Sequence, residues 1–209
     1  MVDQALQDGA RPMDALPGDS LPVGGFGRNH VAWWGVLCLI ATEASLFAYL
    51  LFSYYYIGLQ YGPAWLPARH PSLMLSAPDT VVLLLSSVAV WWGEKGVIQG
   101  RRRQQLAGLA IAILLGAIFI AVQLVEWSQK RFGIASSSYG SLYYTITGFH
   151  MAHVVVGLIV LATLLGWSVA GFFGQRRHTP ILIGSAYWHF VDVVWLFVFS
   201  TFYLTPYLF

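Results

Sequence analysis

The chain has 209 residues, of which 57% are apolar and only 10% are charged, and its net charge is +2. Because soluble domains carry roughly 25% charged residues, this composition indicates an integral membrane protein. The small net charge argues against a nucleic-acid partner, and the single cysteine, Cys38, excludes an internal disulfide.

The N-terminal segment is polar. Residues 1–30 contain four aspartates together with several prolines and glycines, and they lack a basic stretch followed by an apolar core. A secretory signal peptide needs both of those features. We therefore predict a flexible polar tail over residues 1–30 and a membrane domain over residues 31–209.

Five later segments are apolar enough to cross a bilayer, which takes about 20 residues. We expect helices because backbone groups in hydrocarbon must be satisfied within the segment, and because the apolar runs are continuous rather than alternating. The sequence therefore predicts an all-α, polytopic bundle of five transmembrane helices. The predicted spans are about 31–57, 79–97, 106–126, 140–170 and 181–206. The glycine-rich and basic stretch at 93–105 is predicted to be a connecting loop.

Basic residues are distributed unequally between the two ends of the predicted bundle. One end is shared by the N-terminal segment and the loops at 93–105 and 171–180. It carries Arg11, Arg28, Lys95, Arg101, Arg102, Arg103, Arg176 and Arg177, whereas the other end carries Arg69, Lys130 and Arg131. Because cytoplasmic loops are enriched in lysine and arginine, the N-terminus is predicted to be cytoplasmic and the C-terminus to lie outside.

Six ionisable side chains lie within the predicted spans or at their edges: Glu43, Glu126, His150, His153, His189 and Asp192. A charge at the bilayer centre costs about 2.5–3.5 kcal/mol, so such groups are expected to be neutral, paired, or directed toward protein or water. His189 and Asp192 are three residues apart and share a helix face that should point into the bundle. His150 and His153 have the same spacing, and a contact from one of them would give Glu43 a partner.

Three interpretations of these residues remain open. Histidines from two helices are able to hold a haem or a zinc ion, although adjacent histidines on one face suit separate axial ligation poorly. Acids and histidines also mark proton or solute paths, but transporters more often show internal pseudo-symmetry and broken helices. The favoured interpretation is structural: the polar groups fix helix register within the bundle or against a partner subunit.

Four stretches, in one order along the chain, point to a particular family. They are Tyr187–Trp195 (YWHFVDVVW), Thr147–Val154 (TGFHMAHV), Gln123 with Glu126, and Glu43 with Phe47. Together they resemble subunit III of the haem–copper terminal oxidases, from about residue 30 to the end. The departures from the usual pattern are mild: Thr42 in place of serine, Asp79 in place of asparagine, Trp127 in place of tyrosine and Met151 in place of glycine.

The resemblance implies a non-catalytic subunit of an oxidase in an aerobic respiratory chain. The catalytic subunit I, with its haem and copper, reduces dioxygen to water and pumps protons. Subunit III binds neither cofactor, packs against subunit I, sustains proton uptake and protects the complex during turnover. The resemblance assigns to Glu43 the role of the family's buried, carbodiimide-reactive carboxyl, and it makes Glu126, His150, His153, His189 and Asp192 a buried polar framework. It also allows a bound phospholipid, and Arg101, Arg102 and Arg103 are candidates for contact with its headgroup.

Seven-span members of this family have two helices before the first span found here, whereas five-span members are bacterial. The resemblance therefore implies the bacterial inner membrane and, in first place, a cytochrome c oxidase. The resemblance leaves two alternatives open: a quinol oxidase subunit and an accessory membrane protein of nitric oxide reduction. A small membrane cytochrome b is the alternative from another class.

Overall fold

The computed structural model describes residues 31–62, 65–66, 73–130, 132–174 and 178–207. The predicted tail over residues 1–30 lies outside these ranges, so that domain boundary stays a prediction. Within them the chain forms five long helices: α1 (Val31–Tyr61), α2 (Leu73–Ile98), α3 (Arg102–Gln129), α4 (Ser138–Val169) and α5 (Thr179–Phe199). All five are long and apolar enough to cross a membrane, which confirms the predicted all-α bundle.

The connection between the second and third spans is shorter than the predicted loop at 93–105. Residues 99–101 alone join the two helices, because α2 ends at Ile98, one residue after the predicted end, and α3 begins at Arg102. The glycines in this stretch indicated a turn, but Gly93 and Gly96 instead allow α2 and α3 to approach each other closely. α2 also begins at Leu73, earlier than predicted, and carries Pro78 inside its first turns.

The helical hairpin of α2 and α3 is the closest contact in the bundle. A Cβ atom on Gly108 would lie 2.6 Å from the Cα of Gly93 and 2.7 Å from the carbonyl oxygen of Ala89. Only glycine fits at such a separation, as is common where membrane helices pack through small residues. The hairpin is therefore held backbone against backbone, with little side-chain volume between its helices.

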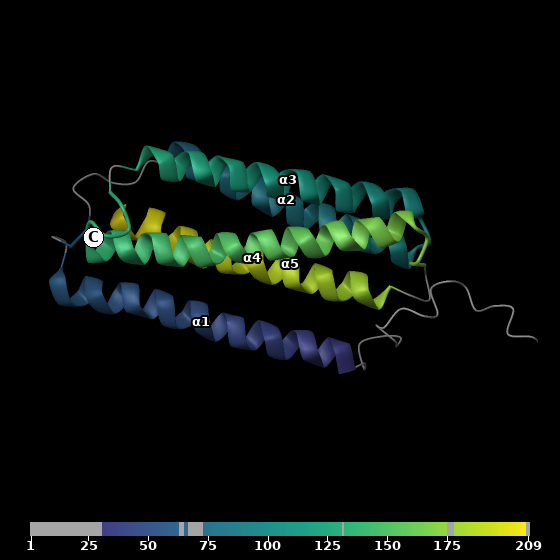
Figure 1. Ribbon diagram of the computed structural model, residues 1–209, viewed down its shortest axis with the longest axis horizontal. Coiled ribbons are helices and arrows are strands. Elements are labelled where there is room, and N and C mark those ends of the chain that lie inside the picture. The colour runs from purple at the N-terminus through teal and green to yellow at the C-terminus, as the bar shows by residue number, and fades with distance from the viewer. Residues whose placement is uncertain (1–30, 63–64, 67–72, 131, 175–177, 208–209) are drawn as a thin grey trace, which may run out of the picture.

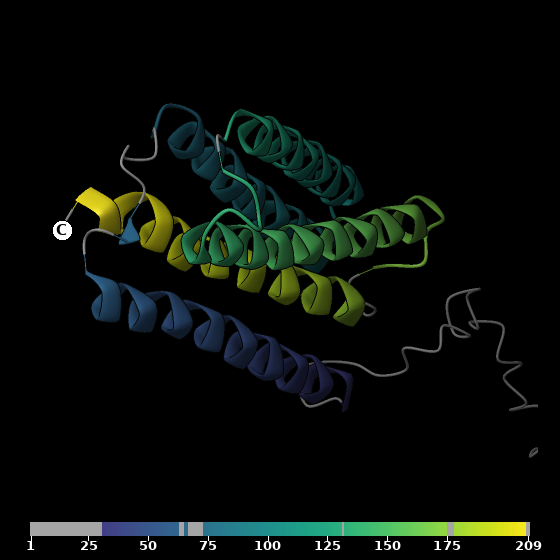
Figure 2. The same cartoon turned by 60° about the vertical axis from the view of Figure 1, so that its left-hand side comes forward.

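α4 and α5 lie between this hairpin and α1 (Figures 1 and 2). Trp188 of α5 is one of two fully buried tryptophans in the core, and its ring fills the space left by Gly116 of α3 and Gly157 of α4. Core residues thus come from α3, α4 and α5 at one level, and small residues on two helices accommodate one large residue on the third.

α1 is the least buried helix. Of the 18 residues in its most apolar stretch, only 11% are buried by the rest of the chain. It contacts α4 and α5, and it buries Val36, Phe47 and Tyr54 on that side. Its remaining faces expose large apolar side chains, among them Trp34, Tyr49, Phe52, Tyr56 and Leu59. α1 therefore presents most of its surface to lipid or to another protein.

The end of α5 departs from α-helical geometry. A π-helical turn over Ser200–Leu204 follows Phe199, and a 3₁₀ turn over Thr205–Tyr207 follows that. The π turn adds one residue to the helical turn and buries Thr201, Phe202 and Tyr203 together. This local widening directs Tyr203 toward the end of α3.

The close approach of α2 and α3 gives a direct test. Gly108→Ala places a methyl group against the backbone of α2, which cannot move aside cheaply, so we expect a loss of about 1–3 kcal/mol in unfolding free energy. Gly166→Ala in α4 is the matched control, because a Cβ there meets nothing within 4 Å. Thermal denaturation of the purified proteins in detergent measures both, and equal midpoints for the two variants would contradict the packing described.

Candidate functional site

Ser87 on α2 joins the two polar residues of the last span. Its hydroxyl donates to Asp192 and lies 2.8 Å from Nδ1 of His189. Because the single hydroxyl proton goes to Asp192, Ser87 accepts its second hydrogen bond from Nδ1–H of His189. Asp192 is 4% exposed. The shared face of His189 and Asp192 points into the bundle and meets a serine of another helix.

Further hydrogen bonds join α2 to α5 along their length. They run from Trp188 Nε1 to Ser86 Oγ (2.9 Å), from Trp195 Nε1 to Thr80 Oγ1 (3.0 Å) and from Ser185 Oγ to Glu94 Oε2 (2.7 Å). Each partner on α5 is buried, and its side chain bonds a single side chain of α2. A shift of α5 by one turn would leave these donors without acceptors, so the set fixes the register of the two helices.

Glu43 and His153 form the polar contact between α1 and α4. Nε2 of His153 lies 3.0 Å from Oε2 of Glu43, and Nδ1 lies 2.7 Å from the carbonyl oxygen of Phe149. A carbonyl oxygen only accepts, so Nδ1 carries a proton. The contact between Nε2 and the carboxyl group then needs one further proton, on either the imidazole or the acid. The pair therefore holds one shared proton and is neutral as a unit, which suits a membrane interior.

This pair is not sealed inside the chain. The side chain of Glu43 is 29% exposed and that of His153 is 13% exposed, on the side where α1 covers the bundle loosely. The shared proton therefore lies within reach of whatever packs against α1 and α4, which distinguishes this contact from the enclosed bonds between α2 and α5.

His150 has a different environment, although it lies one turn from His153. It is 1% exposed and packs among the rings of Phe47, Phe119 and Trp195, with the Trp195 centroid 4.9 Å away. The two histidines share a helix face, as the spacing indicates, but only His153 reaches Glu43. The structure thus places one histidine of the pair in a polar contact and the other in an aromatic environment.

Glu126 is the centre of a cluster at the end of the bundle where α3 ends. It is 5% exposed and accepts from Ser76 (3.2 Å), from the hydroxyl of Tyr203 and from Nζ of Lys130 (2.8 Å). Tyr203 is in turn 3.1 Å from the hydroxyl of Tyr143. Donors from α2, from the π turn and from the end of α3 therefore meet on one carboxylate, and α4 is joined to it through Tyr203.

The three arginines at residues 101–103 differ in their contacts with the rest of the chain. The guanidinium of Arg102 donates to the carbonyl oxygens of Val169 (2.8 Å) and Ser168 (3.5 Å), at the end of α4. Arg102 therefore adds a side-chain donor at the end of α4, where the carbonyl oxygen of Ser168 also accepts from the backbone N–H of Gly171. Arg101 and Arg103 are exposed at the same end of the bundle.

The histidines that the structure describes in the spans contact protein groups rather than one another. Within the described ranges, no group of three or more His, Cys, Asp or Glu side chains is arranged to hold a metal ion. The polar residues instead form separate contacts between different pairs of helices.

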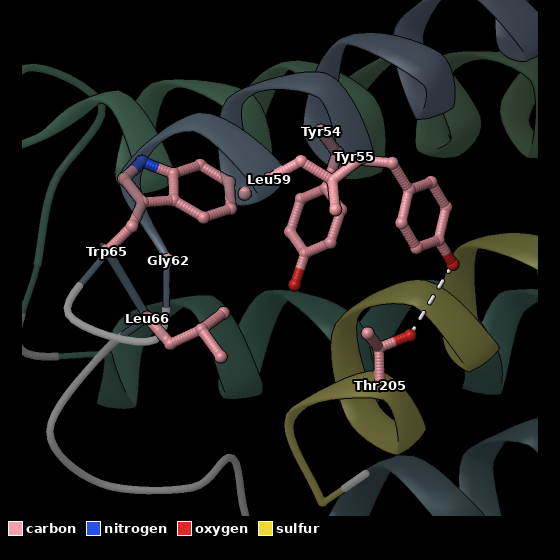
Figure 3. Close-up of a pocket in the computed structure, with 8 residues that line it drawn as sticks. Tyr54, Tyr55, Leu59, Gly62, Trp65, Leu66 and Thr205 are labelled. Carbon is pink, nitrogen blue, oxygen red and sulfur yellow. Dashed lines mark hydrogen bonds between the residues drawn. The ribbon is translucent and has the colours of Figure 1, made fainter. Parts of the chain in front are cut away.

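An apolar cavity of about 300 Å³ lies between the end of α1 and the C-terminal turn. Figure 3 shows Tyr54, Tyr55, Trp65, Leu66 and Thr205 around it. The polar atoms at its edge are largely occupied: the Tyr55 hydroxyl is 3.1 Å from Thr201, and the Trp65 indole donates to Ser138 at 2.7 Å. The chemistry of this lining suits a hydrocarbon chain.

Comparison with known proteins identifies the family. The family model described as cytochrome c oxidase subunit III matches residues 28–207. The chain is 35% identical to cytochrome c oxidase subunit 3 of Cyprinus carpio, 36% to that of Danio rerio and 33% to that of Gallus gallus. Each of these matches covers 81% of this chain and 68% of the relative. The chain belongs to the cytochrome c oxidase subunit III family.

Membership of this family confirms the principal sequence prediction, a subunit of cytochrome c oxidase. Neither the family model nor the relatives favour the alternatives of a quinol oxidase subunit or an accessory protein of nitric oxide reduction. The five helices and the family together indicate a multi-pass membrane protein whose partners are other subunits of the oxidase complex.

The buried polar residues could be identified from the sequence, but most of the side chains that bind them could not. Ser87, Ser76 and Tyr203 cannot be singled out from the sequence, because each is at least 50 residues from its partner. Lys130 was the exception that sequence could have found, since it lies four residues after Glu126 on the same helix.

Because Ser87 contacts both His189 and Asp192, its substitution is expected to destabilise the protein. Ser87→Ala removes the hydrogen-bond partner of both His189 and Asp192, so we expect a loss of about 1–3 kcal/mol in unfolding free energy. The matched control is Ser45→Ala, because the Ser45 hydroxyl is exposed and bonds only its own helix backbone. Thermal denaturation compares the two variants. If Ser87→Ala were as stable as Ser45→Ala, the contact would not hold α2 to α5.

Proposed function

We propose that this chain is a cofactor-free subunit of a proton-translocating cytochrome c oxidase, in which it packs against the catalytic subunit I. The family places it in the complex. The absence of a catalytic role is supported by the way its polar side chains are used: His153, His189, Asp192 and Glu126 are engaged in contacts between helices. The haem and copper centres belong to the partner subunits.

Glu43 is the proposed functional carboxyl. Support comes from the proton that it shares with His153 and from the exposure of this pair on the open side of α1. A neutral proton-holding pair at a subunit surface can give up or take up a proton with little change in the rest of the bundle. Through this pair the chain supports proton uptake by the complex.

The surface of α1 is proposed to be covered in the assembled complex. Its exposed aromatic and aliphatic side chains are suited to an apolar neighbour, and its few contacts within the chain leave room for one. A phospholipid is the proposed occupant of the cavity beside Tyr54 and Leu66, since the lining is apolar and opens at the end of α1. At the opposite end of the bundle, Arg101 and Arg103 are the proposed contacts for the headgroups of other lipid molecules, whereas Arg102 already binds the end of α4.

The membrane is proposed to be the bacterial inner membrane, with the N-terminus in the cytoplasm. Support comes from the excess of basic residues at one end of the five spans. Arg101 and Arg103 then face the cytoplasm, and the Glu126 cluster lies at the outer end.

The role of Glu43 is tested by Glu43→Gln, because the amide can still hydrogen-bond His153 but cannot share its proton. We expect oxygen reduction to persist, while proton uptake or the lifetime of the enzyme during turnover falls. The measurements are proton uptake in reconstituted vesicles and oxygen consumption followed until activity is lost. Glu94→Gln is the matched control, since Glu94 only accepts from Ser185. If neither proton uptake nor the lifetime of the enzyme changes in Glu43→Gln, Glu43 is only a packing residue.

The orientation is tested with single cysteines in a Cys38→Ser background. Gln99→Cys and Ile134→Cys place exposed thiols at opposite ends of α3. A membrane-impermeant maleimide added to intact cells should label residue 134, and it should label residue 99 only after lysis. The reverse pattern would place the N-terminus outside.

A further inference from the structure

Several buried polar side chains lack hydrogen-bond partners among the residues that the structure describes, and two of them, Asp79 and Gln123, lie on the adjacent helices α2 and α3. Both carboxyl oxygens of Asp79 and both amide atoms of Gln123 are in this state, although Asp79 is 2% exposed and Gln123 is 1% exposed. Buried polar groups are nearly always hydrogen-bonded, because burying one without a partner destabilises the fold. Four such atoms in one hairpin therefore call for an explanation.

The packing of α2 and α3 places these two residues in the same layer. The helices are antiparallel, with Ser76 bonded to Glu126 near one end and Gly93 against Gly108 further along. One helical turn along α2 from Ser76 is Asp79, and one turn back along α3 from Glu126 is Gln123. This register puts Asp79 and Gln123 at the same level of the hairpin, one turn from the contact between Ser76 and Glu126.

In the part of the chain that the structure describes, no basic side chain forms an ion pair with Asp79. Lys130 is 2.8 Å from Glu126, and Ser76 and Tyr203 also donate to that carboxylate. Lys130 and Glu126 thus neutralise each other. Glu126 also lies within electrostatic reach of Asp79, so a second negative charge there would be repelled. An isolated carboxylate at this depth would cost several kcal/mol, and such groups become neutral instead.

A neutral acid and a primary amide are complementary. The acid has one hydroxyl donor and one carbonyl acceptor, and the amide has an NH₂ donor and a carbonyl acceptor. The two side chains are not bonded directly to each other. One water molecule between them has two donors and two acceptors, and it would satisfy all four of the unpartnered atoms.

We propose that Asp79 is a protonated carboxylic acid paired with the Gln123 amide, and that it forms a second proton-holding site in this chain, beside the Glu126 cluster. The ligand of this site is a proton. The site does not depend on the proposed role of Glu43, because it lies on other helices and has other partners. It differs from the Glu43 pair in being enclosed, so the proton it holds is retained rather than exchanged at a subunit surface.

Infrared spectroscopy of the purified oxidase complex tests this proposal. A protonated carboxyl group gives a C=O stretching band apart from the carboxylate bands, and the band moves in D₂O if the proton exchanges. We expect Asp79→Asn to assemble with an unchanged thermal midpoint, because asparagine is a neutral mimic of the acid, and to lose one acid band. Retention of every acid band in the assembled variant, or failure of the variant to assemble, would overturn the proposal.

A second variant examines the amide partner. Gln123→Ala leaves the acid in place but removes its hydrogen bonds, so the Asp79 band should shift rather than disappear. An unshifted band would show that Gln123 does not bind the acid and would overturn the pairing. The readout is separate from proton uptake, so a failure here and a failure of the role of Glu43 are distinguishable.

Discussion

A polar side chain in the hydrocarbon region of a membrane must find its partner within the protein, and this constraint organises the whole bundle. Water offers no competing hydrogen bonds there, so one hydroxyl can determine how two helices meet. Ser87 does so for α2 and α5 by contacting both His189 and Asp192. Glu43 and His153 do so for α1 and α4. The polar residues are few, but each one specifies a neighbour, which apolar packing in lipid does not.

Two kinds of contact therefore hold different parts of the bundle together. The hairpin of α2 and α3 is held by direct backbone approach at Gly93 and Gly108, with the charged cluster of Glu126 at one end. α1 is held by a small number of specific contacts and leaves most of its surface open. The tight part suits a scaffold, and the open part suits docking in a larger complex. The proton shared by Glu43 and His153 lies at the boundary between the two.

The helices could be predicted from the sequence because each span is a continuous apolar run, and the family could be recognised because its motifs lie within single helices. The length of the loop at 93–105 could not be predicted, since a glycine that permits close helix packing is indistinguishable in one sequence from a glycine that permits a turn. The spacing of His150 and His153 indicated a shared face but not which ring would reach Glu43. The partners Ser87 and Tyr203 depend on contacts across helices, and the second also depends on the π turn that follows Phe199.

The central claim is that the acids and imidazoles of this chain hold its helices together and leave electron transfer to neighbouring subunits. An electron cryo-microscopy map of the intact complex in lipid, at a resolution that shows side chains, tests it most directly. We expect the map to show Ser87 between His189 and Asp192, Glu43 on His153, and haem and copper density only in other subunits. Iron or copper bound by these side chains, or a continuous water-filled pore lined by them, would contradict it.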